Sequence, residues 1–338
     1  MTSHDMEATA RALVAPGKGI LAADESLGTI GKRFDEIKLP NVEENRRSYR
    51  ELLFTTPKLG QFISGVILFD ETIRQQARDG TPFTEVLKRQ GIIPGIKVDK
   101  GAKPLAGFLG EKITEGLDGL RGRFQEYFQL GARFSKWRAV ITIGDGIPTD
   151  ACLMANANAL ARFAALSQEA GLVPIVEPEV LMDGNHDLER CEAVTQKTLH
   201  MVFDALLIQR VVLEAMLLKP NMVVAGKDCP RQPSSEEVAR ATVRCLRRNV
   251  PAAVPGIVFL SGGQSEVLAT ENLNAINWLG PHPWQVSFSF GRALQAAPLK
   301  TWHGEPGKLN EAQQALYLRA QANGAAQMGN YSPDTHSQ

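Results

Sequence analysis

The sequence predicts a single (β/α)8 barrel, and three observations lead to this fold class. Eight short apolar runs recur along the chain, most of the stretches between them are long enough for a helix, and the length is 338 residues. Strands that alternate with helices indicate a parallel sheet, and eight such units in a chain of this length are typical of a closed barrel. The alternative is an open, doubly wound sheet. That fold usually has a glycine-rich turn after its first strand, and neither GxGxxG nor GxxxxGK[ST] occurs there.

The expected elements follow this pattern in chain order. We expect strands at residues 19–23 (GILAA), 63–69 (ISGVILF), 92–98 (IIPGIKV), 139–143 (AVITI), 172–177 (LVPIVE), 211–218 (VVLEAMLL), 256–260 (GIVFL) and 284–290 (WQVSFSF). Helices are clearest at residues 155–170, 235–248 and 311–322, which are rich in strong helix formers. The end of the chain is small and polar, so we expect one barrel domain over residues 1–320 and a mobile C-terminal tail over residues 321–338.

The composition excludes several classes of function. The chain has 37 Lys plus Arg and 37 Asp plus Glu residues, so its formal net charge is zero and indicates no general affinity for nucleic acid or an anionic membrane. The N-terminus lacks the apolar core of a signal peptide, and no apolar stretch reaches the ~18 residues of a membrane span. The four cysteines have no CxxC spacing, which favours a reducing compartment. We therefore expect a cytoplasmic enzyme.

Lys219 is the residue that points most directly to chemistry. It follows the apolar run 211–218, in which Glu214 is the single charged residue. An ammonium group at the end of such a run should lose part of its hydration, which lowers its pKa. A neutral lysine amine can attack a carbonyl carbon and form a Schiff base. The alternative interpretation is a lysine that merely extends to water from a buried strand.

Charged residues also accompany the other strands. In barrel enzymes the catalytic groups project from the carboxyl ends of strands, and Asp24 directly follows the first apolar run. Three pairs of charged residues stand at positions i and i+2: Lys97 with Asp99, Lys136 with Arg138, and Glu177 with Glu179. Such residues share one face of a strand, so each pair should point into the lumen. Because Lys136 and Arg138 precede the run 139–143, that strand either starts earlier or places the pair lower in the barrel.

These residues are consistent with one mechanism. Schiff-base formation needs a carboxyl group of raised pKa that moves a proton to and from the carbinolamine oxygen. Glu177 beside Glu179 suits this task, because two like charges in one site raise one pKa. Lys136 would supply the neighbouring cation that lowers the pKa of Lys219. Asp24 could accept a hydroxyl proton during carbon–carbon cleavage.

The last two strands end in residues that suit a phosphate group. Barrels often bind phosphate through the loops after strands seven and eight. These loops offer backbone N–H groups without obstructing side chains, a hydroxyl and a guanidinium, from Ser261, Gly262, Gly263, Ser289, Gly291 and Arg292. An anionic substrate is therefore indicated. Glycine turns that merely close the two loops are the alternative.

Taken together, the residues resemble a known family, the class I (Schiff-base) fructose-bisphosphate aldolases. The matching segments run in order over residues 17–295 and cover the whole predicted barrel: GKGILAADES, EENRRSYRELLF, GIKVDKG, LAGFLGEKITEGLDGL, FSKWRAVI, PIVEPEVL, LLKPNMV, FLSGGQSE and FSFGRALQ. The resemblance implies a metal-independent lyase that reversibly cleaves fructose 1,6-bisphosphate to dihydroxyacetone phosphate and glyceraldehyde 3-phosphate in glycolysis or gluconeogenesis. It also implies that the enzyme needs no cofactor, acts on a phosphorylated sugar and forms a homotetramer.

The resemblance further implies a role for each matching residue. Lys219 would form the Schiff base, and Glu177, supported by Glu179, would be the general acid/base for carbinolamine dehydration. Asp24 would deprotonate the C4 hydroxyl, and Lys136 would position the substrate and tune the site electrostatically. The C1 phosphate would be bound by Ser261, Gly262, Gly263, Ser289, Gly291 and Arg292. The C6 phosphate would be bound by Arg33, Lys97 and Arg138, with Arg46 as a weaker match near the same site.

Some alternatives stay open at this point. Animal members of the family end in a tyrosine linked to enamine protonation, whereas this chain ends in Gln338, so the source of that proton stays open. A metal-dependent aldolase is the nearest alternative in chemistry, but the six histidines show no HxxxH or comparable spacing. A barrel that binds without catalysis is another alternative. A preference for sedoheptulose 1,7-bisphosphate or fructose 1-phosphate stays open as well.

Overall fold

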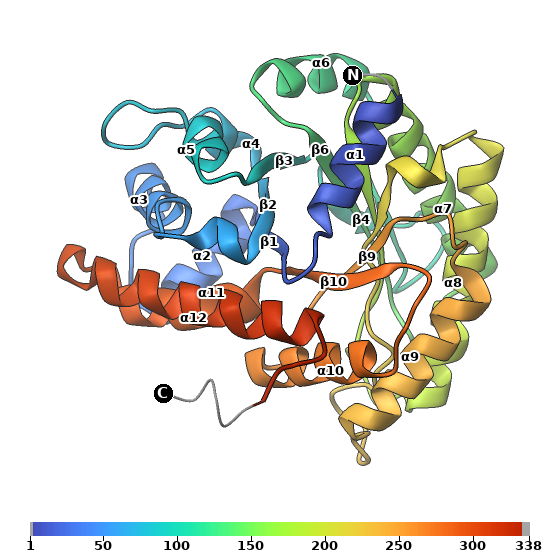
Figure 1. Ribbon diagram of the computed structural model, residues 1–338. Helices are drawn as coiled ribbons and strands as arrows, with labels where there is room; N and C mark the ends of the chain where they lie inside the picture. The colour runs from blue at the N-terminus through green and yellow to red at the C-terminus, as the bar shows by residue number, and fades with distance from the viewer. Residues whose placement is uncertain (1–2, 333–338) are drawn as a thin grey trace.

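The computed structural model describes residues 3–332 and confirms the (β/α)8 barrel (Figure 1). Every neighbouring pair of barrel strands is parallel, and around the closed sheet the order is β1-β10-β9-β8-β7-β6-β3-β2. The strands are β1 (Gly19–Ala23), β2 (Ile63–Leu68), β3 (Ile93–Lys97), β6 (Phe134–Ile141), β7 (Val173–Val180), β8 (Leu217–Leu218), β9 (Gly256–Phe259) and β10 (Gln285–Phe290).

Helices surround the barrel, as Figure 1 shows. They are α1 (Ser3–Leu13), α2 (Leu27–Glu36), α3 (Glu43–Phe54), α4 (Asp70–Ile73), α5 (Phe83–Arg89), α6 (Leu120–Gln129), α7 (Asp150–Glu169), α8 (Leu188–Ile208), α9 (Ser235–Asn249), α10 (Glu266–Trp278), α11 (Arg292–Trp302) and α12 (Leu309–Gln327). A short antiparallel hairpin, β4 (Ala102–Pro104) with β5 (Lys112–Thr114), lies outside the barrel and was not predicted. Among the described helices, none has both the length and the apolar character to cross a bilayer.

Apolar side chains fill the amino-terminal half of the lumen. On β6 and β7 the alternating inward positions begin with Phe134, Val173 and Ile175, which are fully buried. Phe134 lies so close to β3 that a Cβ atom on Gly95 would be 2.3 Å from its ring, so glycine is required there. Val14, which follows α1, packs into the same cluster. Among the described residues, this end of the barrel is therefore filled by apolar side chains, and the cavity opens at the carboxyl ends of the strands.

The strand boundaries differ from the prediction on two central strands. β6 begins at Phe134 rather than at residue 139, and β7 continues to Val180 rather than ending at residue 177. Charged residues led the sequence pattern to shorten both strands. In a barrel such residues are compatible with a strand, because alternate side chains point into the lumen. Lys136 therefore lies within β6, and the earlier start left open above is the correct interpretation.

The run 211–218 is also different from a simple strand. A 3₁₀ helix occupies Leu213–Ala215, and only Leu217 and Leu218 form β8. The backbone N–H of Lys219 nevertheless donates to the carbonyl of Val176 at 2.8 Å, which extends the pairing with β7 by one residue. This contact places Lys219 at the carboxyl end of β8, as predicted.

The predicted tail boundary at residue 320 is wrong for residues 321–327, because α12 continues to Gln327. The helix packs against the chain near β1: a Cβ atom on Gly324 would lie 2.6 Å from the carbonyl oxygen of Gly17. The Gln327 side chain also accepts a hydrogen bond from the backbone N–H of Gly17 at 2.6 Å. Small residues here allow close packing, whereas the sequence suggested disorder. Residues 333–338 of the predicted tail lie outside the described part of the chain.

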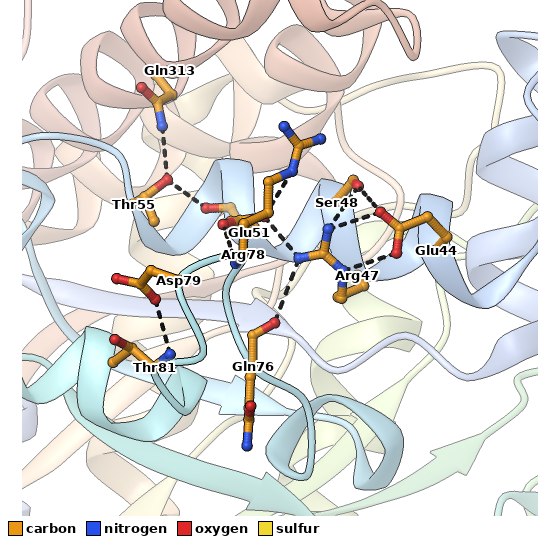
Figure 2. Close-up of polar contacts among 10 residues, drawn as sticks. All are labelled: Glu44, Arg47, Ser48, Glu51, Thr55, Gln76, Arg78, Asp79, Thr81 and Gln313. Atoms are coloured by element: carbon orange, nitrogen blue, oxygen red, sulfur yellow. Dashed lines mark hydrogen bonds and ion pairs between the residues drawn. The ribbon is translucent and has the colours of Figure 1, made fainter.

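A polar network fixes α3 to the segment after α4, and Figure 2 shows it in detail. Arg47 donates to Glu44 at 2.8 and 3.0 Å and to Glu51 at 2.8 Å. Glu51 also accepts from the backbone N–H of Arg78 at 2.8 Å. The polar face of α3 is thus occupied by contacts within the outer layer of the barrel.

Candidate active site

A cavity of about 830 Å³ opens at the carboxyl ends of the barrel strands. It is lined by every site residue predicted above except one, and this set is Asp24, Arg33, Lys97, Lys136, Arg138, Glu177, Glu179, Lys219, Ser261, Gly262, Gly263, Ser289, Gly291 and Arg292. Arg46 is the exception. Its guanidinium forms two hydrogen bonds with Glu71, at 2.8 and 2.6 Å, which join α3 to α4 outside the cavity.

Four charged side chains form the centre of this cavity, which we call the central cluster: Asp24, Lys136, Glu177 and Lys219. The Lys219 ammonium lies 3.1 Å from Oε1 of Glu177. The Lys136 ammonium lies 3.0 Å from Oε2 of Glu177 and 2.7 Å from Oδ2 of Asp24. All four residues are at most 9% exposed. Four strands are needed to build the cluster, since Lys136, Glu177 and Lys219 come from the successive strands β6, β7 and β8, and Asp24 follows β1.

The electrostatics of the cluster follow from these pairings. Burial by itself would raise the pKa of Asp24, but the Lys136 ammonium outweighs burial and holds this pKa well below its usual range. Burial also opposes the charge on Glu177, yet Lys136 and then Lys219 lower its pKa. Burial would lower the pKa of Lys136, but the carboxylates of Asp24 and Glu177 raise it. Both carboxylates and Lys136 are therefore charged at neutral pH when no ligand is bound.

The expected rise in the pKa of Glu177 is wrong, because this pKa is lowered in the structure. Glu179 does not act on Glu177 as an unpaired like charge, because Nε of Arg138 forms an ion pair with the Glu179 carboxylate. Glu177 instead contacts two ammonium groups, which lower its pKa. Similarly, Lys136 was expected to act on Lys219 directly, but it contacts Asp24 and Glu177. The shared carboxylate of Glu177 links the two lysines.

The three i, i+2 pairs do share the lumen, as predicted. Both members of each pair line the cavity. Lys97 lies 3.5 Å from Oδ1 of Asp99, and the backbone N–H of Arg138 donates to Oδ2 of Asp99 at 3.3 Å. Lys97 and Arg138 come from the neighbouring strands β3 and β6 and place two cationic side chains, each paired with a carboxylate, on one wall of the cavity.

A region whose chemistry suits an anion lies on the opposite wall, at the ends of β9 and β10. Gly262 and Gly263 have φ values of +55° and +94°, a backbone conformation that favours glycine. A Cβ atom on Gly263 would lie 3.6 Å from Nη2 of Arg292, so this guanidinium lies over the turn. Arg292 is also the first residue of α11, whose free N–H groups favour an anion. The Ser289 hydroxyl is buried without a hydrogen-bond partner among residues 3–332.

Arg33 lies on this second wall and not with Lys97 and Arg138, where the resemblance assigned it. A Cβ atom on Gly291 would lie 3.7 Å from Nη2 of Arg33. The sheet order explains the placement, because β1, which precedes Arg33, is paired with β10 and is separated from β3 by β2. Sequence alone does not show which strands are neighbours, so it could not assign Arg33 to a wall.

The sequence interpretation missed some cavity residues. Thr29, Lys32 and Glu36 line the cavity together with Arg33, and their spacing is that of one helix face, so a helix prediction for this segment could have found them. Lys227 and Asp183 also line the cavity and form an ion pair at 2.5 Å. They lie in two loops that only the fold brings together, and no sequence signal marks them. Within the described residues, no cluster of three or more His, Cys, Asp or Glu side chains could hold a metal ion.

Comparisons with known proteins found similar sequences and a similar solved structure. The sequence model of one family, described as fructose-bisphosphate aldolase class-I, matches residues 5–338. A probable fructose-bisphosphate aldolase class 1 of Xanthomonas axonopodis pv. citri is 59% identical, over 98% of this chain and 99% of the relative. The cytosolic fructose-bisphosphate aldolase 4 of Arabidopsis thaliana is 54% identical, over 98% of this chain and 85% of the relative. A solved structure of fructose-bisphosphate aldolase from Plasmodium falciparum, in complex with TRAP and a small-molecule inhibitor, has a TM-score of 0.97 at 54% identity and covers 98% of this chain and 96% of that one.

Proposed function

Because the chain belongs to the class I fructose-bisphosphate aldolase family, we propose that its cavity cleaves fructose 1,6-bisphosphate through a Schiff base on Lys219. The products are dihydroxyacetone phosphate and glyceraldehyde 3-phosphate, and the reaction is reversible. The observation that carries the residue assignment is the central cluster: a buried lysine lies 3.1 Å from a buried carboxylate, between two walls that each carry cationic side chains.

Schiff-base formation uses Lys219 and Glu177. The amine must lose a proton before it can attack the ketone carbon, and Oε1 of Glu177 is placed at 3.1 Å to accept it. This transfer leaves a neutral amine and a protonated Glu177. The amine nitrogen bonds to C2 of the sugar, and one of its two protons moves to the ketone oxygen, which becomes the carbinolamine hydroxyl. Glu177 then returns its proton to that oxygen, which leaves as water, and an iminium ion remains on Lys219.

Carbon–carbon cleavage uses Asp24. The Asp24 carboxylate is charged at neutral pH because Lys136 lowers its pKa, so it can accept the proton of the C4 hydroxyl. As this proton leaves, the C4 oxygen forms the aldehyde carbonyl, the bond between C3 and C4 breaks, and its electron pair moves to the iminium ion to give an enamine. Protonation of the enamine at C3, followed by addition of water, releases dihydroxyacetone phosphate and returns Lys219.

The two walls orient the substrate along the cavity. Ser261, Gly262, Gly263, Ser289, Gly291 and Arg292 bind the C1 phosphate. Lys97 and Arg138 bind the C6 phosphate on the opposite wall. Two charge-assisted anchors hold C2 near Lys219 and the C4 hydroxyl near Asp24, and such positioning is a large part of catalysis.

The test is performed with the purified full-length protein. We expect it to cleave fructose 1,6-bisphosphate and to retain this activity in EDTA. We also expect borohydride to inactivate it only when dihydroxyacetone phosphate is present, and peptide mapping to find the reduced adduct on Lys219. An adduct on any other residue, or loss of activity in EDTA, contradicts the proposed mechanism.

The oligomeric state and the location are further parts of the proposal. Family resemblance supports a homotetramer, and relatives that include a cytosolic plant enzyme support a cytoplasmic location. Light scattering on the purified protein should give about four times the chain mass of 36.9 kDa. A mass equal to that of one chain contradicts the tetramer and leaves the catalytic proposal unaffected.

A further inference from the structure

A buried carboxylate beside the central cluster has no place in the mechanism above. Glu25 follows Asp24, is 8% exposed and lines the cavity. Its Oε2 accepts from Nη2 of Arg50 at 2.6 Å, and its Oε1 accepts from Nε2 of Gln295 at 2.8 Å. Oε1 also forms an ion pair with Nη1 of Arg33. We call these four residues, Glu25, Arg33, Arg50 and Gln295, the Glu25 cluster.

The contacts of the Glu25 cluster fix one nitrogen of the Arg33 guanidinium group, Nη1. Arg50 and Gln295 are buried, and the Gln295 amide also donates to the carbonyl of Ala22 at 2.7 Å, so Glu25 is held to both β1 and α11. Burial would raise the pKa of Glu25, but Arg33 first and Arg50 second lower it. Glu25 is therefore charged at neutral pH and holds Nη1 of Arg33 on a rigid support.

The other nitrogen of this guanidinium group, Nη2, is directed to the cavity wall at the ends of β9 and β10. Nη2 is the atom that would lie 3.7 Å from a Cβ on Gly291, and it makes no hydrogen bond within residues 3–332. Two guanidinium groups share one carboxylate in the Glu25 cluster, so one positive charge remains in excess. A phosphate at Gly291 would neutralise this charge and accept from Nη2 of Arg33.

We propose that Glu25 is a positioning residue that holds Arg33 against the Gly291 turn, so that Arg33 and Arg292 bind the same substrate phosphate. This inference rests on the proposed function, since it takes the Gly291 turn as the C1-phosphate site. It departs from the assignment of Arg33 to the C6 phosphate. The two assignments predict different results with two substrates, because fructose 1-phosphate carries the C1 phosphate and lacks the C6 phosphate.

The experiment compares steady-state kinetics of Glu25→Gln with both substrates. We expect KM to rise about tenfold for fructose 1,6-bisphosphate and for fructose 1-phosphate alike, with kcat changed less than about threefold, because a charge-assisted contact to a bound group is weakened while the central cluster is intact. Arg292→Ala should show the same pattern and mark the C1 end. Lys97→Ala should raise KM for fructose 1,6-bisphosphate alone and mark the C6 end.

Two further variants separate positioning from a structural effect. Glu192→Gln removes another buried carboxylate that is paired with an arginine, Arg244, between α8 and α9, and it should leave both KM values unchanged. In an Arg33→Ala background, Glu25→Gln should add no further rise in KM, because its effect passes through Arg33. Should Glu25→Gln not fold, Glu25→Asp keeps the charge and should give a smaller KM rise with the same substrate pattern.

The outcomes are distinct. A KM rise confined to fructose 1,6-bisphosphate places Arg33 at the C6 phosphate and overturns the proposal. An unchanged KM with both substrates, or an effect that persists in the Arg33→Ala background, makes Glu25 a structural residue only. Failure of the proposed function would look different, because the unmodified protein would then show no turnover and no borohydride adduct on Lys219.

Discussion

Replacing Lys219 with alanine will abolish both cleavage of fructose 1,6-bisphosphate and borohydride trapping of dihydroxyacetone phosphate. The amine supplies the covalent route, and its loss removes the iminium ion that accepts the electrons of the broken bond, so kcat/KM should fall by at least about 10⁴-fold. Activity assays and intact mass after borohydride treatment measure the two effects.

The fold should survive this substitution. Lys219 forms an ion pair with Glu177, which keeps its contact with Lys136 at 3.0 Å when Lys219 is replaced. Circular dichroism should therefore show a folded protein. Lys227→Ala is the matched control, because Lys227 also lines the cavity but is paired with Asp183 and is far more exposed. The Lys227→Ala variant should still form the adduct. An adduct trapped in the Lys219→Ala variant would contradict the mechanism.

Replacing Glu177 with glutamine should have the second largest effect. Glutamine keeps the shape of the side chain but cannot carry a proton between the Lys219 amine and the carbinolamine oxygen. We expect kcat to fall by about 10²–10⁴-fold, the usual contribution of a positioned general acid/base. The rate of borohydride trapping in the presence of dihydroxyacetone phosphate should fall together with kcat, because the affected step precedes formation of the iminium ion.

Glu179→Gln is the control for this prediction. Glu179 lies two residues along the same strand and is also buried, but it is paired with Arg138 and makes no contact with Lys219. Its loss should slow trapping much less than the loss of Glu177. Equal losses in the two variants would show that the carboxylate pair acts as a unit, and would contradict the separate roles proposed for Glu177 and Glu179.

The pairing of Glu177 shows where prediction from sequence ends. The i, i+2 spacing of Glu177 and Glu179 correctly placed both side chains in the lumen, because a strand has a period of two. The same spacing suggested that the two carboxylates repel each other and raise one pKa. In the structure each has a cation from another strand, so the pKa of Glu177 is lowered. The spacing of residues along one strand shows which way their side chains point, but it does not show which residues of other strands they pair with.

The arginines lead to the same lesson. Arg292 lines the cavity as expected, because it follows its strand directly and its position is fixed by local geometry. Arg33 and Arg46 lie on helices, where the sequence does not show which strand end faces them. The structure places Arg33 beside Gly291, and Arg46 outside the cavity with Glu71.

Composition did not predict the structure of the first part of the tail. Residues 321–327 are small and polar enough to suggest disorder, yet they continue α12 because Gly324 allows the helix to approach Gly17. A residue that weakens an isolated helix becomes favourable once a neighbouring segment packs against it.

The sequence by itself predicted the barrel, the position of Lys219 at the end of a strand and the charged residues at the ends of the other strands. Apolar periodicity and residue type are local properties of the chain, so they can be found without the fold. Only the tertiary structure decided which charges are paired, on which wall each arginine lies and which carboxylate contacts Lys219. The physical reason is that closing the sheet brings β1, β6, β7 and β8 together at one end. Coulomb energies between buried charges depend steeply on these distances, and no spacing along the chain contains them.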